Sequence, residues 1–347
     1  FTAILISNLL IDRWMSRGKG IKVSNKITEN FLIHNNIDFI GKRKITYMIS
    51  AILLISGFIS FATKGFELGV DFVGGREYKV RFEQPISAQK VKSDLDNVFG
   101  GGTIVKTIGS ANQFKITTSY LIDKNSSESD HLADNALYNG VKKYLPSNTS
   151  FETFKQINLL SQQKVDPTIS VDIIKSSTWA VLLSIIGIFM YILIRFRSLG
   201  YSLGAIVSTA HDAILMLVLF SLLHGILPFS LEIDQTFIAA ILTVIGYSLN
   251  DTVIIYDRLR EYLSVKNDKP MAANMNAAIN STLSRTFNTS FTTLITLTIL
   301  FIFGGESLRS FSFAMMIGVA IGTYSSIFVA APIMYDFERF RNRNKKS

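Results

Sequence analysis

The stretch TFIAAILTVIGYSLNDTVIIY, residues 236–256, determines the class of this chain, because it is apolar enough to span a membrane yet contains a carboxylate. A membrane-spanning helix needs about 20 apolar residues, and this run has that length. Asp251 lies roughly 10 Å of helix from the charged residues 257–260, at about 1.5 Å per residue. A charge at that depth costs about 2.5–3.5 kcal/mol even on the most forgiving insertion scale, so an intramembrane carboxylate indicates a functional site.

The composition predicts a membrane protein with one sizeable soluble domain. Of the 347 residues, 48% are hydrophobic, which is too many for an ordinary soluble protein, and 18% are charged, which is too many for membrane spans alone. The formal net charge of +9 does not predict nucleic-acid binding, because the basic residues cluster at the ends of apolar runs. The chain has no cysteine, which excludes disulfides and thiolate metal sites.

Six apolar runs are long enough to cross a bilayer. They are residues 45–63, 173–196, 199–224, 235–256, 283–303 and 311–335. Lys and Arg gather before the first run, after the second and fourth runs, and at the end of the chain. An alternating topology then places every basic cluster on one side of the membrane, which the positive-inside rule identifies as the cytoplasm.

This topology divides the chain into five parts. In order, we expect the end of a preceding helix with a cytoplasmic linker, the first full span, an extracytoplasmic α+β domain, a five-helix transmembrane bundle and a basic cytoplasmic tail. Their residues are 1–43, 44–64, 65–171, 172–338 and 339–347. The first part is expected because the sequence opens inside an apolar stretch, without a starting Met.

The segment 65–171 has the pattern of an α+β domain. The expected elements are a strand at 78–82, an amphipathic helix at 88–99, a hairpin of 103–108 with 114–118, a helix at 130–145 and a strand at 150–157. Ser87 stands at the N-cap position of the first helix, and Pro146 stops the second. The order β-α-β-β-α-β is the ferredoxin-like plan.

Three of the predicted spans carry polar residues at helical spacing, so that each has one polar face. The faces consist of Thr243, Tyr247, Asn250 and Asp251; of Gly204, Ser208, His211 and Asp212; and of Arg285, Asn288, Thr289, Thr292 and Thr296. Because lipid cannot hydrogen-bond these groups, we expect the three faces to meet inside a bundle.

Two interpretations of this polar interior remain open. In the first, Asp251 and Arg285 form a buried ion pair that only fixes helix packing. In the second, Asp251 carries protons, because titratable groups on neighbouring helices line up with hydroxyls that can hold water. His211 and Asp212 would then act as a relay. Without further ligands, this His-Asp pair does not predict a metal site.

Two glycine motifs are expected to have structural roles. Asp71 begins the sequence DFVGG directly after the first span, and the pair Gly74-Gly75 permits a sharp turn there, so we expect a hinge at the membrane–domain junction. No Lys-Ser or Lys-Thr follows, so this motif is not a phosphate loop. Gly318 and Gly322 in the last span have the spacing of a close-packed helix contact.

A set of motifs occurs in a fixed order from about residue 40 onward. They are GVDFVGG at 69–75, HD at 211–212, VIGYSLNDT at 244–252, DRLRE at 257–261, RTFNTSFTT at 285–293, FGG at 303–305 and GVAIGTYSS at 318–326. With these motifs at these spacings, the chain resembles the SecF family, whose members work with SecD in the bacterial Sec protein-export machinery. Residues 1–14 resemble the end of the last SecD helix, which implies the C-terminal (SecF) half of a fused SecDF chain. Arg76 departs from the family, which usually has a small hydroxyl residue there.

The resemblance implies a function as well as a fold. It implies an RND-superfamily transmembrane fold in the bacterial cytoplasmic (inner) membrane, and a component that uses the proton motive force to assist translocation and release of exported proteins. It makes Asp251 the proton site and Arg285 its basic partner, with protons as the coupling ion, no cofactor and no enzymatic reaction. The implied partners are the SecD half, the SecYEG translocon, YajC-like and YidC-like membrane proteins, unfolded exported polypeptides and the lipid bilayer.

Two other functions remain open. The chain could be a passive structural scaffold of the translocon that uses no protons. It could also be a small-molecule exporter of the RND type, although one domain of about 105 residues is small for a substrate-binding cleft. An enzyme is not predicted, because no nucleophile–base pair or metal cluster is visible.

Overall fold

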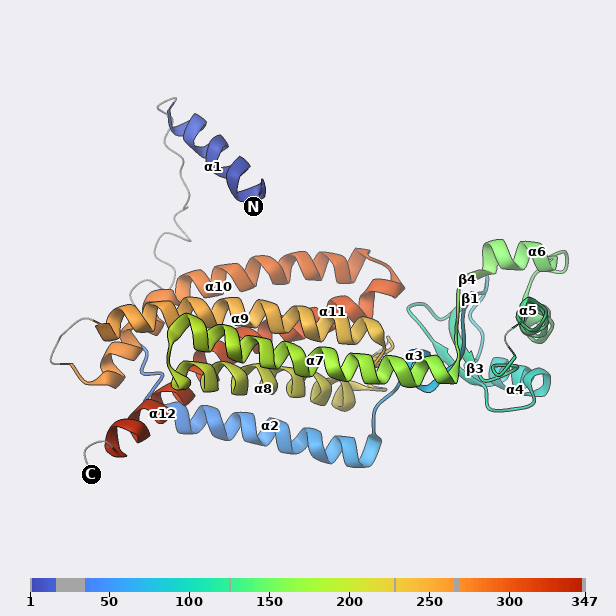
Figure 1. Ribbon diagram of the computed structural model, residues 1–347. Coiled ribbons are helices and arrows are strands. Elements are labelled where there is room, and N and C mark those ends of the chain that lie inside the picture. Colours follow the sequence, from blue (N-terminus) through green and yellow to red (C-terminus); the bar gives the residue numbers. More distant parts are fainter. Residues whose placement is uncertain (1, 17–34, 125, 228, 265–268, 345–347) are drawn as a thin grey trace.

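Figure 1 shows a computed structural model in which a bundle of long helices carries a small α+β domain at one end. The structure describes residues 2–16, 35–124, 126–227, 229–264 and 269–344. Most of the predicted linker, residues 17–34, lies outside the described residues, and the predicted basic tail is described only as far as Asn344. Before the linker, α1 (Thr2–Met15) exposes apolar side chains such as Leu9 and Trp14.

Six of the described helical segments are long and apolar enough to cross a membrane, which confirms the six predicted spans. They are α2 (Arg43–Lys64), α7 (Pro167–Phe196), α8 (Leu199–Leu223), α9 (Gln235–Ser264), α10 (Met271–Phe303) and the continuous run of α11 (Glu306–Ser325), η3 (Ser326–Ala330) and α12 (Ala331–Asn344). α9 and α10 are longer than predicted, because the polar residues beyond their apolar runs continue the helices.

Helices α9 and α11 approach each other closely at small residues. A Cβ atom on Gly318 would lie 2.2 Å from Cγ2 of Val244, and one on Gly322 would lie 2.8 Å from Cβ of Ser248. The contact of α2 with α8 is similar, since a Cβ on Gly57 would lie 2.1 Å from a methyl group of Val218. Close approach of backbones through glycine is typical of helix association in membranes.

The last span changes its helical pitch at the end of this glycine contact. Residues Ser326–Ala330 form a π-helical turn between α11 and α12. The Ser326 hydroxyl donates to the carbonyl of Gly322 at 2.8 Å and is hydrogen-bonded to the hydroxyl of Thr252, on α9, at 2.8 Å. Single π-helical turns inside α-helices often occur at functional sites.

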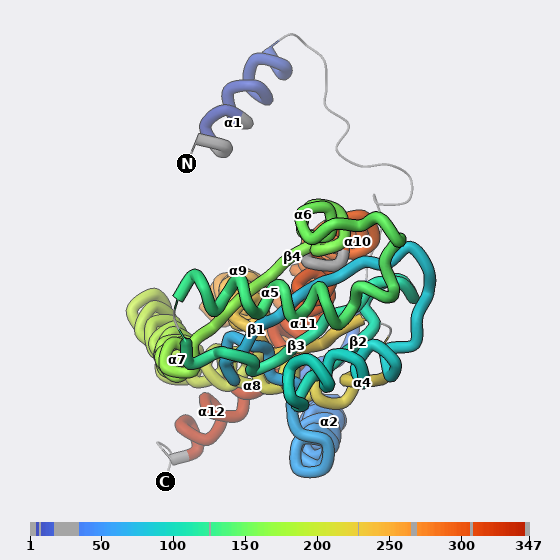
Figure 2. The backbone as a smooth tube through the Cα atoms, turned by 90° about the vertical axis from the view of Figure 1, so that its right-hand side faces the viewer, coloured from blue at the N-terminus to red at the C-terminus, as the bar shows by residue number. Residues whose placement is uncertain are grey.

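The α+β domain has the predicted ferredoxin-like order of elements. Its strands β1 (Gly75–Arg81), β2 (Ile104–Thr107), β3 (Gln113–Thr118) and β4 (Leu159–Val165) form an antiparallel sheet in the order β2-β3-β1-β4. The helices α4 (Ala88–Phe99) and α5 (Ser127–Val141) cover the face of the sheet that points away from the bundle, as Figures 1 and 2 show. The apolar core between these helices and the sheet includes Val91, Leu95, Phe114, Ile116 and Leu137, all fully buried.

The last strand of the domain lies later in the sequence than predicted. Residues 150–157 are not a strand: Ser150 caps the short helix α6 (Phe151–Thr153), and a π-helical turn η2 (Phe154–Asn158) follows. Phe151 and Phe154 stand three positions apart, which is helical spacing, and Phe154 is buried in the core. The strand β4 follows that turn, and its polar, largely exposed residues show no alternation that predicts a strand.

Helix α7 begins directly at the end of this strand. Asp166 follows Val165, and its side chain accepts a hydrogen bond from the backbone N of Thr168 at 2.9 Å. Pro167 is the first helical residue, and both residue types favour a helix start at these positions. The 30-residue α7 is therefore joined to the sheet without a flexible linker.

We expect Gly318→Ala to destabilise the bundle, because the new methyl group would overlap Val244 and overpacking costs about 1–3 kcal/mol. The thermal midpoint of the purified protein in detergent, followed by fluorescence-detected size exclusion, should fall below that of the wild type. Gly187→Ala is the matched control, because nothing lies within 4 Å of a Cβ at that position. Adding Val244→Ala should recover part of the loss. An unchanged midpoint for Gly318→Ala would contradict the close contact.

Candidate functional site

Helix α9 places Asp251 in the interior of the bundle. The residue is 1% exposed, and its Oδ2 atom has no hydrogen-bond partner among the described residues. The hydroxyl of Thr286, on the neighbouring helix α10, is also buried and has none within the same part of the chain. Buried polar atoms without a partner are rare in proteins, and each one requires a functional or structural reason.

Arg285 does not contact this carboxylate directly. It forms no ion pair with Asp251 within 4.0 Å, both residues being described, so it acts on the carboxylate through its charge at longer range. Its exposed side chain instead lines a cavity of about 240 Å³ at the end of α9 and α10 that lies away from the domain. The other lining residues are Ile254, Asp257, Arg258, Glu261, Ser281 and Thr282.

Asp212, on α8, is another buried carboxylate of the bundle, and hydroxyl groups of two neighbouring helices donate to it. It is 0% exposed, and its Oδ2 accepts hydrogen bonds from the hydroxyls of Ser248 at 2.6 Å and Ser325 at 2.8 Å. The Ser208 hydroxyl donates in turn to that of Ser325 at 3.1 Å. Because these serines belong to α8, α9 and α11, the carboxylate joins three helices.

His211 extends this network to a fourth helix, α2. Its Nδ1 lies 3.2 Å from Oδ1 of Asp212, and its Nε2 is hydrogen-bonded to the hydroxyl of Ser50 at 3.1 Å. The Ser50 hydroxyl is hydrogen-bonded to that of Tyr324 at 3.2 Å, and Tyr324 donates to the carbonyl of Thr46 at 3.1 Å. The adjacent residues His211 and Asp212 are therefore part of a larger buried network.

The expectation that all three polar faces meet inside the bundle is only partly correct. The face of α8 is buried, whereas most polar residues of α9 and α10 lie on the outer surface of these two helices. The exposed ones are Thr243, Asn250, Arg285, Asn288, Thr292 and Thr296. The half-buried Tyr247 reaches the hydroxyl of Thr293 at 3.3 Å, and the Thr289 hydroxyl donates to its own helix, at the carbonyl of Thr286, at 2.9 Å. Threonines satisfied by their own helix can face outward.

The predicted hinge lies where the first span meets the sheet. Gly74 and Gly75 have φ angles of +74° and +139°, which side chains disfavour. Buried Asp71 accepts a hydrogen bond from the side-chain amide of Gln163, on β4, at 2.6 Å, and another from the backbone N of Gln235, at the start of α9, at 3.0 Å. Arg76 is buried beside the pair and donates to Asp130 at 2.6 Å.

Burial also shifts the pKa values of titratable groups in the loop near this junction. It raises the pKa of Asp234, and the neighbouring carboxylates of Asp71 and Glu232 add to the effect, whereas the hydrogen bond from the backbone N of Phe237 opposes it. Burial likewise lowers the pKa of His224, with the positive charges of nearby lysines adding to it. Both directions favour the neutral form of the group. Among the described residues, no three His, Asp or Glu side chains gather to hold a metal ion.

Comparison with known proteins identifies the family. A family model described as "Protein export membrane protein SecD/SecF, C-terminal" matches residues 146–339, and one described as "SecD/SecF GG Motif" matches residues 59–86. The protein translocase subunit SecF of Rhodothermus marinus is 42% identical over 302 residues, which cover 87% of this chain and 93% of that relative. The chain belongs to the SecF family.

Other relatives agree with this result. The SecF subunit of Petrotoga mobilis is 34% identical over 90% of this chain and 99% of its own length. The crystal structure of SecDF, a translocon-associated membrane protein from Thermus thermophilus, has a TM-score of 0.76 and 27% identity and covers 95% of this chain. The super-membrane-facing form of SecDF has a TM-score of 0.66 at the same identity. The chain spans only 42% and 43% of these SecDF chains.

Four residues of the Asp212 network were not predicted from the sequence. Ser248 and Ser325 occur in motifs shared with the SecF family but were not assigned a role. Ser50 and Tyr324 lie in apolar runs, where a single hydroxyl usually bonds to its own helix. Only the packing of α2 and α11 against α8 shows that these hydroxyls meet His211 and Asp212.

We expect Asp212→Ala to destabilise this SecF-family chain more than Asp251→Ala. The first change removes the buried acceptor of Ser248, and an unsatisfied buried donor costs about 1–3 kcal/mol. The second removes an Oδ2 atom that bonds to none of the described residues. Thermal midpoints of the two variants, purified in the same detergent, test this order. An equal or larger loss for Asp251→Ala would show that this carboxylate is mainly a structural group.

Proposed function

We propose that this chain assists protein export as a SecF subunit and that Asp251 carries protons during that work. Its membership of the SecF family, whose members are named protein translocase subunits, supports the first part. The observation that carries the second part is the full burial of Asp251 with an Oδ2 atom that lacks a partner in the described structure. A buried carboxylate with an unpaired oxygen gains or loses much free energy when its charge changes.

A proton on Asp251 would act through the packing of α9. The same helix presents Val244 and Ser248 to the glycines of α11, so any rotation or tilt of α9 changes that contact. Loss of the negative charge also removes the attraction that Arg285 exerts from α10. Close-packed interfaces switch between discrete arrangements rather than deforming continuously. Protonation would therefore shift α9 relative to α10 and α11.

The cavity beside Arg285 supports an approach for protons from the cytoplasmic side. It lies about one to three helical turns beyond Asp251 along α9, on the way to the charged end of that helix. Its lining includes the carboxylates of Asp257 and Glu261, which are able to exchange protons with water. The positive charge of Arg285 at its wall would favour the anionic form of Asp251 after a proton has left.

We propose that His211 and Asp212, the predicted proton relay, also position the helices around this site. The two hydroxyl donors of Asp212 fix its carboxylate, and His211 connects it to α2. α2 runs into the junction with the α+β domain, and α8 leads through one loop into α9. A change in this network would therefore reach both the domain and the helix that carries Asp251.

The membrane topology proposed for the chain follows from its basic clusters. In the bacterial cytoplasmic membrane, residues 65–171 would lie outside the cytoplasm, where they could act on unfolded exported polypeptides. The exposed polar residues of α9 and α10 support a protein partner at this face, because lipid cannot bond to Arg285 or Asn288. We propose the helices of a SecD half as that partner, in the same chain or complex, next to the SecYEG translocon and YajC-like or YidC-like proteins.

We expect Asp251→Asn to abolish the part of export that depends on the proton gradient, because the amide cannot take up or release a proton. Export of a secreted reporter is measured in vesicles that contain the full translocase, with and without an uncoupler, at matched membrane levels. Asp336→Asn is the matched control, since Asp336 is a partly exposed carboxylate that pairs with Arg43 and lies outside the proposed proton route. Gradient-dependent export by Asp251→Asn would overturn the proton role and favour a passive scaffold.

A second experiment tests the proposed partner. A photo-crosslinking amino acid at Asn288 or Thr292 is expected to form a crosslink to SecD helices in intact membranes, because both positions belong to the exposed polar face of α10. Leu183, which is exposed on the apolar surface of α7, serves as the control position. Mass spectrometry of the crosslinked peptides identifies the partner. Crosslinks to lipid alone, from both α10 positions, would contradict a SecD interface at this face.

A further inference from the structure

The loop between α8 and α9, described at residues 224–227 and 229–234, is attached through Ile233 to the segment that leads from α2 into the sheet. The backbone N of Ile233 donates to the carbonyl of Glu67 at 2.8 Å, and the backbone N of Gly69 donates to the carbonyl of Ile233 at 2.9 Å. These two bonds form a parallel bridge between Leu68 and Ile233. The loop therefore pairs with the domain as a short strand would.

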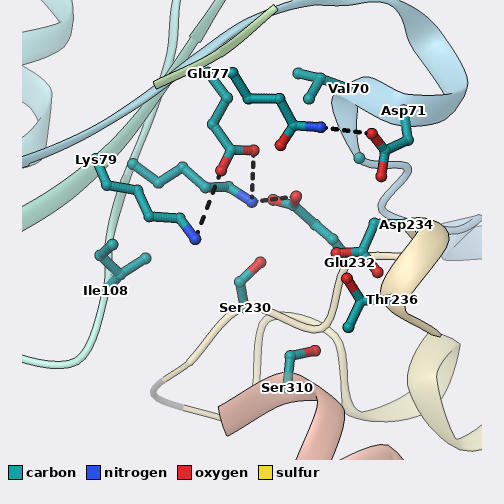
Figure 3. Close-up of a pocket in the computed structure, with 13 residues that line it drawn as sticks. Val70, Asp71, Glu77, Lys79, Ile108, Ser230, Glu232, Asp234, Thr236 and Ser310 are labelled. Atoms are coloured by element: carbon teal, nitrogen blue, oxygen red, sulfur yellow. Dashed lines mark hydrogen bonds and ion pairs between the residues drawn. The ribbon is translucent and has the colours of Figure 1, made fainter. Parts of the chain in front are cut away.

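A buried lysine of the sheet reinforces this attachment. The Lys115 side chain, on β3, is 7% exposed and forms ion pairs with Glu232 of the loop and, at 3.5 Å, with Glu77 of β1. The pair of Glu77 with Lys79 adds a second cation at 3.8 Å, as Figure 3 shows. Removing one member of a buried ion pair leaves an uncompensated charge, so the loop and the sheet hold each other in place.

Asp71 makes a third connection, directly to the first turn of α9. Its carboxylate joins Gln163 of β4 to the backbone N of Gln235, and Asp234 adds a hydrogen bond to the backbone N of Phe237 at 2.7 Å. Two carboxylates therefore bind the amides at the start of α9, where the helix dipole favours negative charge. One of the two, Asp71, belongs to the domain side of the junction.

These contacts are notable because of how the chain is connected. The sheet is joined covalently to α2 through residues 65–74 and to α7 through Asp166, but the helix that carries Asp251 has no such connection. A cavity of about 230 Å³, lined by Asp71, Lys115, Glu232 and Asp234 among others, lies beside these contacts. Figure 3 shows these acidic and hydroxyl side chains around it.

We propose that the α8–α9 loop is the mechanical link between α9 and the extracytoplasmic sheet, and that Lys115, Glu232 and Asp71 are the positioning residues that keep this link closed. The proposal rests on the proposed function, because it gives a route by which a movement of α9 reaches the domain. α9 is a continuous helix from Gln235 to Ser264, so a shift around Asp251 also moves its first turn. Through the loop, that displacement is applied to β3 and β4.

The test is a charge reversal across the ion pair. In a Glu77→Gln chain, which removes the other carboxylate beside Lys115, Lys115→Glu and Glu232→Lys each place like charges together, whereas the double variant restores one cation beside one anion. Because the chain has no cysteine, the substitutions Leu132→Cys on α5 and Ile226→Cys in the loop allow two spin labels to be attached at these exposed positions. Pulsed electron paramagnetic resonance then measures the distance between the domain and the loop. We expect a narrow distance distribution in the chain that keeps Lys115 and Glu232, a broadened one in each single variant and a narrow one again in the double variant.

Gradient-dependent export is measured on the same three variants in the full translocase. It should be lost in both single variants and return in the double variant, which a merely local loss of structure would not produce. Lys143→Glu, at an exposed pair with Asp94 far from the loop, should leave both measurements unchanged. Asp71→Asn keeps an acceptor oxygen but loses the charge. The width of its distance distribution should therefore lie between that of the chain with Asp71 and that of Asp71→Ala.

Two results would overturn the link. One is a distance distribution that stays narrow in both single variants. The other is a double variant that remains broad, inactive in export or absent from the membrane, as the single variants would then be failing for reasons unrelated to pairing. The distance measurement does not depend on proton use. If Asp251→Asn exports normally while charge reversal broadens and then restores the distribution, the link stands and the proton role fails.

Discussion

A polar group inside a membrane must find its hydrogen-bond partner within the protein, and the arrangement of this bundle depends on that constraint. Asp212 meets it with serine hydroxyls from two other helices and with His211, which in turn reaches α2. One carboxylate thereby sets the relative positions of α2, α8, α9 and α11. Asp251, three residues after Ser248 on α9, has an Oδ2 atom without a partner among the described residues. The first carboxylate fixes the helix arrangement, and the second is the one for which we propose a change of protonation state.

The parts of the fold that follow from local patterns were predictable from the sequence. The length of the apolar runs identified the six spans. Turn residues, together with the helical or alternating spacing of apolar residues, identified most of the domain. β4 was placed too early, because the aromatic residues Phe151 and Phe154 stand before the strand, on a helical turn. The strand itself, with Ser161, Gln162 and Gln163 in succession, lies at the edge of the sheet and has no apolar face to show.

The site was predictable only in its residue types. Titratable residues in apolar runs pointed to Asp251 and to His211-Asp212, because such residues are costly in a membrane. The direction of each side chain is a tertiary property, however. Successive residues of a helix differ by about 100°, so Asn250 faces outward while Asp251 is buried. The same rotation carries Arg285 to the outer surface of α10. No pattern within a single span contains this information.

The rigid connection of α7 to the sheet converts angles into distances. With 30 residues, α7 is about 45 Å long at 1.5 Å per residue. Asp166 and Pro167 connect β4 to α7 without a flexible linker. If α7 tilted by about 5° about its far end, the sheet would therefore be displaced by about 4 Å over that length. A small change in the tilt of α7 would thereby be magnified to about the size of a peptide unit at the sheet. The domain would then move as a rigid extension of this membrane-spanning helix.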